Sequence, residues 1–186
     1  MIQGILLAAG SASRFGGGKL LHPLPDGIPV GIASYRNLKV ACPHVIVVVR
    51  EGDEALRRLF ESEDATLVIC HDASEGLSRS LIKGIRASEN AAGWLIALAD
   101  MPFVQPATIE KLVAKLAAGS GIVLPAYQGR RGNPVGLHHR HREALLALQG
   151  DEGARSIIKR HTAENYVFEC SDPGILRDID TRADLG

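Results

Sequence analysis

The sequence has few cysteines, no excess of charge of either sign and no apolar run long enough to cross a bilayer. Its three cysteines, Cys42, Cys70 and Cys170, are widely spaced and form no C-x-x-C pair. This argues against a disulfide framework or a thiolate zinc site and fits a reducing compartment. Lys plus Arg and Asp plus Glu number 21 each, and a net charge of zero argues against broad binding of nucleic acid or anionic membrane. The first residues, MIQGILLAAG, carry no basic leader, so we expect a cytoplasmic location.

What the sequence does contain is an apolar fraction of 46% over 186 residues, enough for one compact domain. Apolar runs alternate with segments of helical periodicity. Continuous apolar strands are typical of a sheet that is covered on both faces. We therefore expect a single-domain α/β fold over residues 1–186, with a doubly wound, mostly parallel, Rossmann-like sheet. The predicted strands are Ile2–Ala8, Val45–Val49, Ala65–Cys70, Trp94–Ala99 and Gly121–Pro125, and the predicted helices are Ile32–Ala41, Asp53–Ser62, Leu77–Ser88 and Ala107–Ala118.

The rhythm changes after Pro125, where the polar stretch Tyr127–Asn133 leads into a short apolar piece, Pro134–Leu137. We expect two more helices and two more strands beyond it. The helices lie near His141–Leu148 and Ala154–His161, and the strand-like segments are Tyr166–Cys170 and Leu176–Ile179. Ligands of open α/β sheets bind at the carboxyl ends of the strands, which selects the loops to inspect.

The loop after the first strand is rich in glycine and carries two cations, Arg14 and Lys19. Small residues let backbone N–H groups approach phosphate oxygens, although a solvated surface loop has a similar composition. Two well-known phosphate motifs do not fit. A P-loop needs Ser or Thr where Leu20 follows Lys19, and the dinucleotide fingerprint needs glycine at the position of Ala12.

A third motif does fit. The segment from Leu7 to Leu20 reads LAAGSASRFGGGKL and closely resembles the signature of nucleotidyltransferases that activate sugars and cofactors, above all the molybdenum cofactor cytidylyltransferases. Four further segments resemble motifs of that family in the same order. They are ADMP from Ala99, GRRGNPV from Gly129, GDEGAR from Gly150 and DIDT from Asp178.

The resemblance implies a nucleotide-binding half over about residues 1–105 and an acceptor-binding half over about 106–186. It implies that Arg14, Lys19 and Asp100 act in catalysis and that Asp100 and Asp180 bind Mg²⁺, with Mn²⁺ as a substitute. The implied nucleotide-binding residues are Leu7, Ala8, Ala9, Gly10, Ser11, Arg14, Lys19, Gly76, Ser78 and Ser80, and the implied acceptor-binding residues are Arg130, Gly132, Asn133 and Pro134. His71 joins the nucleotide-binding set because it follows a predicted strand. Ala9 stands where guanylyl-transferring relatives carry glycine, which favours CTP over GTP.

This chemistry needs positioned charge and no activated nucleophile, since the attacking phosphate oxygen is already ionised. Asp100 ends an apolar strand and is predicted to project at the carboxyl edge of the sheet, where a carboxylate can hold magnesium. We interpret Asp178 as a structural hydrogen-bonding residue. His138, His139 and His141 invite a metal-site interpretation, but neighbouring strand positions point to opposite faces and no carboxylate stands near them in a ligand pattern.

Four functions stay open. The preferred one is transfer of CMP from CTP to the molybdopterin cofactor, with pyrophosphate released and a molybdenum hydroxylase as a possible client. The alternatives are a nucleotidyltransferase that uses GTP or a sugar or alditol phosphate acceptor, a non-catalytic carrier of the molybdenum cofactor, and a nicotinamide-dependent reductase. No partner among nucleic acids or membranes is expected.

Overall fold

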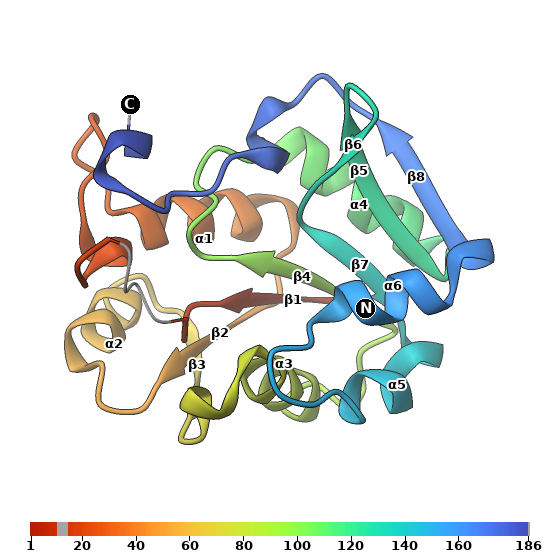
Figure 1. Cartoon of the computed structure of the whole chain (residues 1–186), viewed down its shortest axis with the longest axis horizontal. Helices are drawn as coiled ribbons and strands as arrows, with labels where there is room; N and C mark the ends of the chain where they lie inside the picture. The colour runs from red at the N-terminus through yellow and green to blue at the C-terminus, as the bar shows by residue number, and fades with distance from the viewer. Residues whose placement is uncertain (11–14, 186) are drawn as a thin grey trace.

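The computed structural model describes residues 1–10 and 15–185 and shows one mixed sheet between two layers of helices (Figure 1). The strand order is β3-β2-β1-β4-β7-β5-β6, and β8 pairs with β5. The strands are β1 (Ile2–Leu7), β2 (Val45–Arg50), β3 (Thr66–Cys70), β4 (Gly93–Leu98), β5 (Ile122–Tyr127), β6 (Arg130–Arg131), β7 (Val135–His138) and β8 (Asn165–Glu169). The helices are α1 (Val30–Ala41), α2 (Glu54–Glu61), α3 (Leu77–Arg86), α4 (Pro106–Ala117), α5 (Arg142–Leu146) and α6 (Ala154–Arg160).

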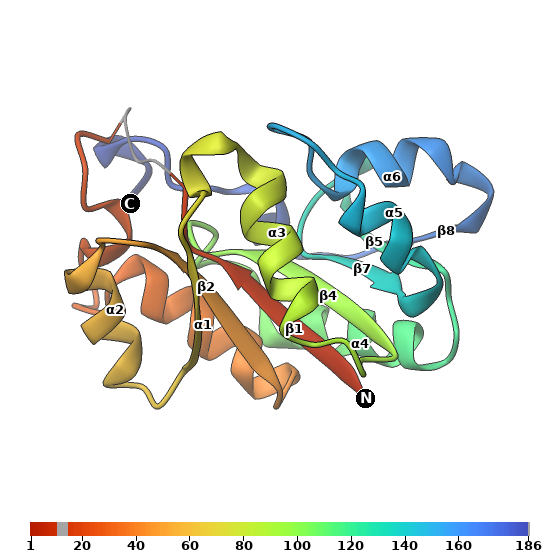
Figure 2. The ribbon, with the colours of Figure 1, turned by 90° about the horizontal axis from the view of Figure 1, so that it is seen from below.

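Each face of the sheet has its own apolar core, as the doubly wound prediction requires. On one face, buried residues of α1, α2 and α4 pack on alternate strand residues such as Leu6 and Val47. On the other face, α3, α5 and α6 pack on the intervening residues, such as Ile5 and Val48. Figure 2 shows α3 lying across β1 on this second face. The alternation follows from the period of two along a strand.

The sheet is parallel through β3, β2, β1 and β4 and then changes direction at β7. β7 runs antiparallel to both β4 and β5, while β8 runs parallel to β5. The predicted α/β class, the mostly parallel sheet and the six helices are confirmed. Trp94 is fully buried in β4 as expected. None of the helices in the described part of the chain is both long and apolar enough to span a bilayer.

One predicted strand is wrong. Leu176–Ile179 does not join the sheet, because Pro173–Leu176 forms a 3₁₀ turn and the next residues run as an irregular segment. The apolar pattern there has a different cause: Ile175 and Ile179 are both fully buried, in separate clusters. Ile179 packs with Phe15, Leu24 and Val30, so the C-terminal segment lies against the segment that follows β1 (Figure 1).

Candidate active site

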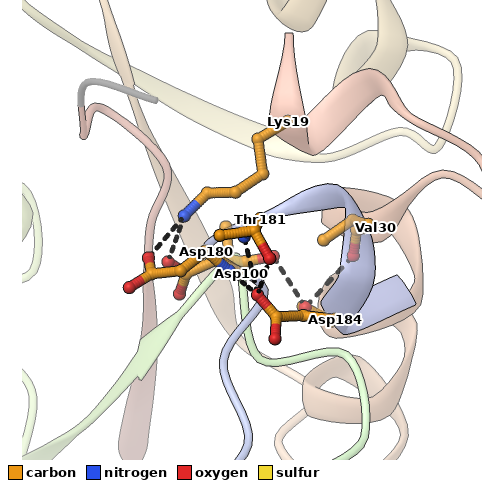
Figure 3. Close-up of polar contacts among 8 residues, drawn as sticks. Lys19, Val30, Asp100, Asp180, Thr181 and Asp184 are labelled. Carbon is orange, nitrogen blue, oxygen red and sulfur yellow. Dashed lines mark hydrogen bonds and ion pairs between the residues drawn. The ribbon is translucent and has the colours of Figure 1, made fainter. Parts of the chain in front are cut away.

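The centre of the candidate site is a group of carboxylates around one lysine (Figure 3). The Nζ of Lys19 lies 2.7 Å from Oδ2 of Asp100 and 3.6 Å from Oδ1 of Asp180. Carboxylate oxygens of Asp100, Asp178 and Asp180 lie within 4.8 Å of one another. Lys19 is about one-eighth exposed on its side chain and Asp100 about one-quarter, so the group sits at the protein surface but is shielded from bulk water on one side.

Two kinds of contact bring these residues together from distant parts of the chain. Asp100 follows β4, and its carbonyl oxygen accepts a hydrogen bond of 2.8 Å from the amide of Ile179. The buried hydroxyl of Ser34 in α1 donates toward the carbonyl oxygen of Ala99 at 2.7 Å. Asp100 is therefore held from the helix side and from the C-terminal segment.

The turn that carries Asp180 is held by Asp184. One carboxylate oxygen of Asp184 accepts hydrogen bonds from the amides of Asp180 and Thr181, at 3.1 and 2.6 Å, and from the hydroxyl of Thr181 at 2.8 Å. The bond from the Thr181 amide is the largest of the effects that lower the pKa of Asp184. The charged form of Asp184 is thus the one that orders this turn.

A cavity of about 450 Å³ opens beside Lys19, and several glycines line it. Gly16, Gly17 and Gly18 all have positive φ values, between 63° and 92°, a conformation that other residues rarely adopt. Ala8, Gly10 and Lys19 also line this cavity. Exposed backbone and a lysine at one wall are the features that accommodate phosphate groups.

Sequence reasoning gave no role at this cavity to Arg50. It ends β2, lines the same cavity and donates from its Nε to the carbonyl oxygen of Ala9 at 3.3 Å. The signal in the sequence was its position directly after a buried strand, where side chains reach the ligand edge of the sheet. Arg50 therefore adds a second cation to the described wall of the cavity, together with Lys19.

A second cavity, of about 480 Å³, lies on the other face and begins at Leu7. Since neighbouring residues of a strand point to opposite faces, Leu7 lines this cavity while Ala8 lines the first. Its walls are mostly aliphatic, and three cations, Arg131, Arg155 and Lys159, stand among them. Arg131 belongs to the same GRRGNPV segment as the predicted acceptor residue Arg130, whereas Arg155 and Lys159 were not among the predicted acceptor-binding residues.

The predicted acceptor residues lie in three places. Gly132 and Asn133 line the second cavity. Pro134 packs beside them at a small depression near Met101, and Arg130 is an exposed residue of the β5–β6 hairpin. The amide of Asn133 donates to the carbonyl oxygen of Ile175 at 2.9 Å, which fixes this loop against the C-terminal segment.

The predicted nucleotide residues also lie in different settings. Leu7 ends β1, and Ala8, Ala9 and Gly10 follow it, whereas Ser11 and Arg14 fall outside the described residues. Ser78 is fully buried, and its hydroxyl has no hydrogen-bond partner in the described part of the chain. The Ser80 hydroxyl faces the thiol of Cys70. Gly76 packs its backbone on Gly150. His71 is well exposed, with its Nδ1 2.7 Å from Glu51.

The three clustered histidines do not form a metal site with one another. The His139 ring stacks on Trp94, and His138 accepts a hydrogen bond from the amide of Arg140. His141 turns inward and is almost fully buried. Burial lowers the pKa of His141, against an opposing effect from Glu164.

The carboxylate group fits a hard divalent cation. Oxygen ligands are those that magnesium and manganese prefer, and the position of the Lys19 ammonium between Asp100 and Asp180 marks the place where positive charge is stabilised. Asp178, which the sequence suggested to be structural, offers a third carboxylate at the same place. Asp100, Asp178 and Asp180 are the residues that would hold such an ion.

Comparison with known proteins finds a matching family and several similar proteins. The family described as the MobA-like NTP transferase domain matches residues 4–165. The chain is 32% identical to a purine catabolism protein, PucB, of Bacillus subtilis, over 96% of this chain and 91% of that protein. It is 30% identical to the nicotine blue oxidoreductase of Paenarthrobacter nicotinovorans, over 97% and 92%.

Two further similarities point toward nucleotidyl transfer. The molybdenum cofactor cytidylyltransferase of Escherichia coli is 25% identical, over 99% of this chain and 93% of that protein. The solved structure of a nucleotidyl transferase from Methanothermobacter thermautotroptrophicus is 25% identical and has a TM-score of 0.83, over 99% of this chain and 94% of that one.

Proposed function

The chain belongs to the family of MobA-like NTP transferase domains and has the fold of a nucleotidyltransferase, and we propose that it transfers CMP from CTP to the molybdopterin cofactor. In this proposal magnesium is the metal, pyrophosphate is the second product, and the reaction takes place in the cytoplasm. The product would then pass to a molybdenum hydroxylase. Support for the nucleotide comes from Ala9 in the first loop, and support for the acceptor comes from the similarity to the cytidylyltransferase.

The observation that carries the proposal is the position of Lys19. It joins the glycine-lined cavity to the carboxylates of Asp100 and Asp180. A triphosphate in that cavity would place its phosphates beside Lys19 and Arg50, whose charges offset the negative charge that develops as pyrophosphate leaves. A divalent ion, when bound by the carboxylates, supplies further charge neutralisation at the phosphates.

The reaction itself needs no protein nucleophile. A terminal phosphate oxygen of the acceptor forms a new bond to the α-phosphorus, and the bond from that phosphorus to its bridging oxygen breaks. The electron pair leaves with pyrophosphate. The chain contributes orientation, because the two cavities are lined by the neighbouring residues Ala8 and Leu7, so that donor and acceptor would approach each other beyond the end of β1.

The second cavity suits the proposed acceptor. Its aliphatic walls, including Leu77, Leu98 and Leu124, would cover the face of a fused ring, and Arg131, Arg155 and Lys159 would pair with its phosphate. The same cavity would also bind other ring compounds that carry a phosphate group. A sugar phosphate offers little apolar surface for these walls, which makes it the less favoured acceptor.

The direct test measures pyrophosphate release from CTP, GTP, ATP and UTP, each with magnesium, with and without molybdopterin cofactor. Release with CTP that requires the pterin supports the proposal. Release with GTP alone would refute the cytidylyl assignment, and release with a sugar or alditol phosphate but no pterin would refute the acceptor. Tight pterin binding without release, unchanged in Asp100→Asn, would indicate a carrier.

A second candidate function is a nicotinamide-dependent reductase, because a relative of 30% identity bears the name nicotine blue oxidoreductase. The missing glycine at Ala12 leaves the chain without the usual dinucleotide fingerprint. Titration with NADH and NADPH, followed by cofactor fluorescence, distinguishes the two functions. Saturable binding of either cofactor without any response to CTP would favour the reductase.

A further inference from the structure

A second cluster of metal-ligating side chains lies beside α5 and α6, apart from the carboxylates around Lys19. His141, His161 and Glu164 each offer one ligand atom, and these atoms lie within 4.8 Å of one another. They come from three elements: His141 from the 3₁₀ turn before α5, His161 from the residue that ends α6, and Glu164 from the turn before β8. Both views show α5 and α6 side by side (Figures 1 and 2).

The distances within the cluster match those between ligands of one ion. Nε2 of His141 lies 3.3 Å from Oε2 of Glu164, and Nδ1 of His161 lies 3.2 Å from Oε1 of the same carboxylate. Ligands about 2.0–2.1 Å from a tetrahedral zinc ion stand about 3.3 Å apart. The side chain of His161 is more than one-third exposed, and its Nδ1 is hydrogen-bonded to the same carboxylate, so the ring can exchange that bond for an ion held between the three side chains.

Two of these atoms lack the partners that buried polar atoms normally have. Nε2 of His141 and Oε2 of Glu164 are both buried, and neither has a hydrogen-bond partner among residues 1–10 and 15–185, although the two atoms face each other. His141 as a whole is only 3% exposed. A buried polar atom without a partner costs free energy, and such an atom that points at a carboxylate and a second imidazole is the arrangement that a metal ion satisfies.

We propose that His141, His161 and Glu164 bind a transition-metal cation of the zinc class, separate from the divalent ion of the active site. Two imidazoles and one carboxylate are ligands that zinc accepts, whereas magnesium prefers an all-oxygen set. Gly121 makes room for the carboxylate, since a side chain at that position would press on Glu164. Nη1 of Arg140 lies 3.6 Å from Oε2 of Glu164 and would repel a bound cation. Its side chain is exposed, so it can adopt another rotamer.

The site has a structural consequence for the second cavity. α6 carries Ala154, Arg155, Ile158 and Lys159 along that cavity and ends at His161. An ion bound by the cluster would connect the end of α6 to the start of α5 and to the turn before β8. Occupancy of the site therefore reduces the mobility of the wall that holds Arg155 and Lys159.

The test uses the full chain without an affinity tag, freed of metal by chelation. Zinc chloride is titrated while the melting temperature is followed, and cobalt chloride is titrated while visible absorption is followed. The wild type binds one equivalent of each ion at this site. Zinc at 100 times its dissociation constant raises the melting temperature by about 5–10 °C.

Two variants remove ligands at partly exposed positions and leave the buried His141 in place. His161→Phe keeps an aromatic ring against His141, and Glu164→Gln keeps the shape of the carboxylate. Each weakens zinc binding at least about tenfold and abolishes the cobalt absorption band. Two controls keep both signals: His139→Phe removes a histidine that stacks on Trp94, and Asp100→Asn alters the carboxylates around Lys19.

Hydrogen exchange gives a second, local measurement. Zinc slows the exchange of amides between residues 154 and 169 in the wild type and in both controls, and leaves it unchanged in His161→Phe and Glu164→Gln. Absence of zinc binding by the wild type, or equal binding by all five proteins, would overturn the proposal. So would loss of binding in Asp100→Asn alone, because the ion would then belong to the active site.

Discussion

The amide of Ile179 donates a 2.8 Å hydrogen bond to the carbonyl oxygen of Asp100 and thereby joins two segments that are 79 residues apart. The side chain of Ile179 is fully buried among Phe15, Leu24 and Val30. One residue thus fixes Asp180 beside Asp100 and also packs on the segment that leads to Lys19. The position of the carboxylates in the candidate site therefore depends on this packing.

Substitution of Lys19 tests the electrostatic balance of the carboxylate group. In Lys19→Met the carboxylates of Asp100, Asp178 and Asp180 lose the cation among them, so their mutual repulsion rises. We expect kcat/KM to fall by about 10²–10³-fold, and the stabilisation by magnesium to exceed that of the wild type. Thermal melts at increasing magnesium chloride measure the second effect. Lys39→Met, at an exposed lysine bonded to a backbone carbonyl, is the control, and an equal magnesium response in both variants would contradict the prediction.

Substitution of Ser34 tests how α1 positions Asp100. The Ser34 hydroxyl is buried and donates toward the carbonyl oxygen of Ala99. Ser34→Ala removes this donor and is expected to lower the free energy of unfolding by about 1–2 kcal/mol, with a weaker response to magnesium. Ser62→Ala removes an exposed hydroxyl that bonds to Leu59 and should stay within about 0.5 kcal/mol. Urea unfolding of both variants makes the comparison, and similar losses would show that burial of Ser34 is irrelevant.

The turn at Asp180 is expected to depend on pH through Asp184. Its hydrogen bonds with Thr181 and Asp180 lower the pKa of the Asp184 carboxyl in the folded protein. A lowered folded pKa contributes stability that is present above the unfolded pKa, about 3.9, and is lost as the pH falls through the folded value. Asp184→Asn should therefore melt below the wild type at pH 6, and the gap should shrink as the pH falls below about 4. Melting curves of both proteins across this pH range test the prediction. A difference in melting temperature that widens as the pH falls would contradict it.

Gly76 should tolerate no side chain, in contrast to Gly10. Gly76 has φ 121°, and a Cβ there would collide with the backbone of Gly150. Gly76→Ala is expected to cost about 2–5 kcal/mol from strain and overpacking together. Within the part of the chain that the structure describes, a Cβ on Gly10 would meet no atom within 4 Å, so Gly10→Ala should change the stability by less than about 0.5 kcal/mol. Denaturant unfolding of the two variants checks the difference, which would be absent if the loop around Gly150 could move aside.

Most helices and strands were predictable because their signals are local. The run of β-branched residues Val45–Val49 predicts a buried strand by itself, and the observed strand β2 is longer only by Arg50. The strand Leu176–Ile179 was wrongly predicted from the same kind of signal. Its Ile179 is buried by contact with Phe15, Leu24 and Val30 of the segment after β1, and an apolar pattern carries no information about which partner buries it.

The sequence by itself determined the layered α/β class, the glycine-lined loop after β1 and the carboxylate at the end of β4, because periodicity and motif spacing are properties of neighbouring residues. Only the tertiary structure decided that Lys19 lies between Asp100 and Asp180, that Arg50 and Arg131 stand at the two cavities, and that β7 enters the sheet antiparallel. It also brought His141 to His161 and Glu164. Such proximities arise when helices and loops that are distant in sequence pack on the same sheet. Closing the long loops between them costs chain entropy, so these contacts form only when the rest of the fold stabilises them.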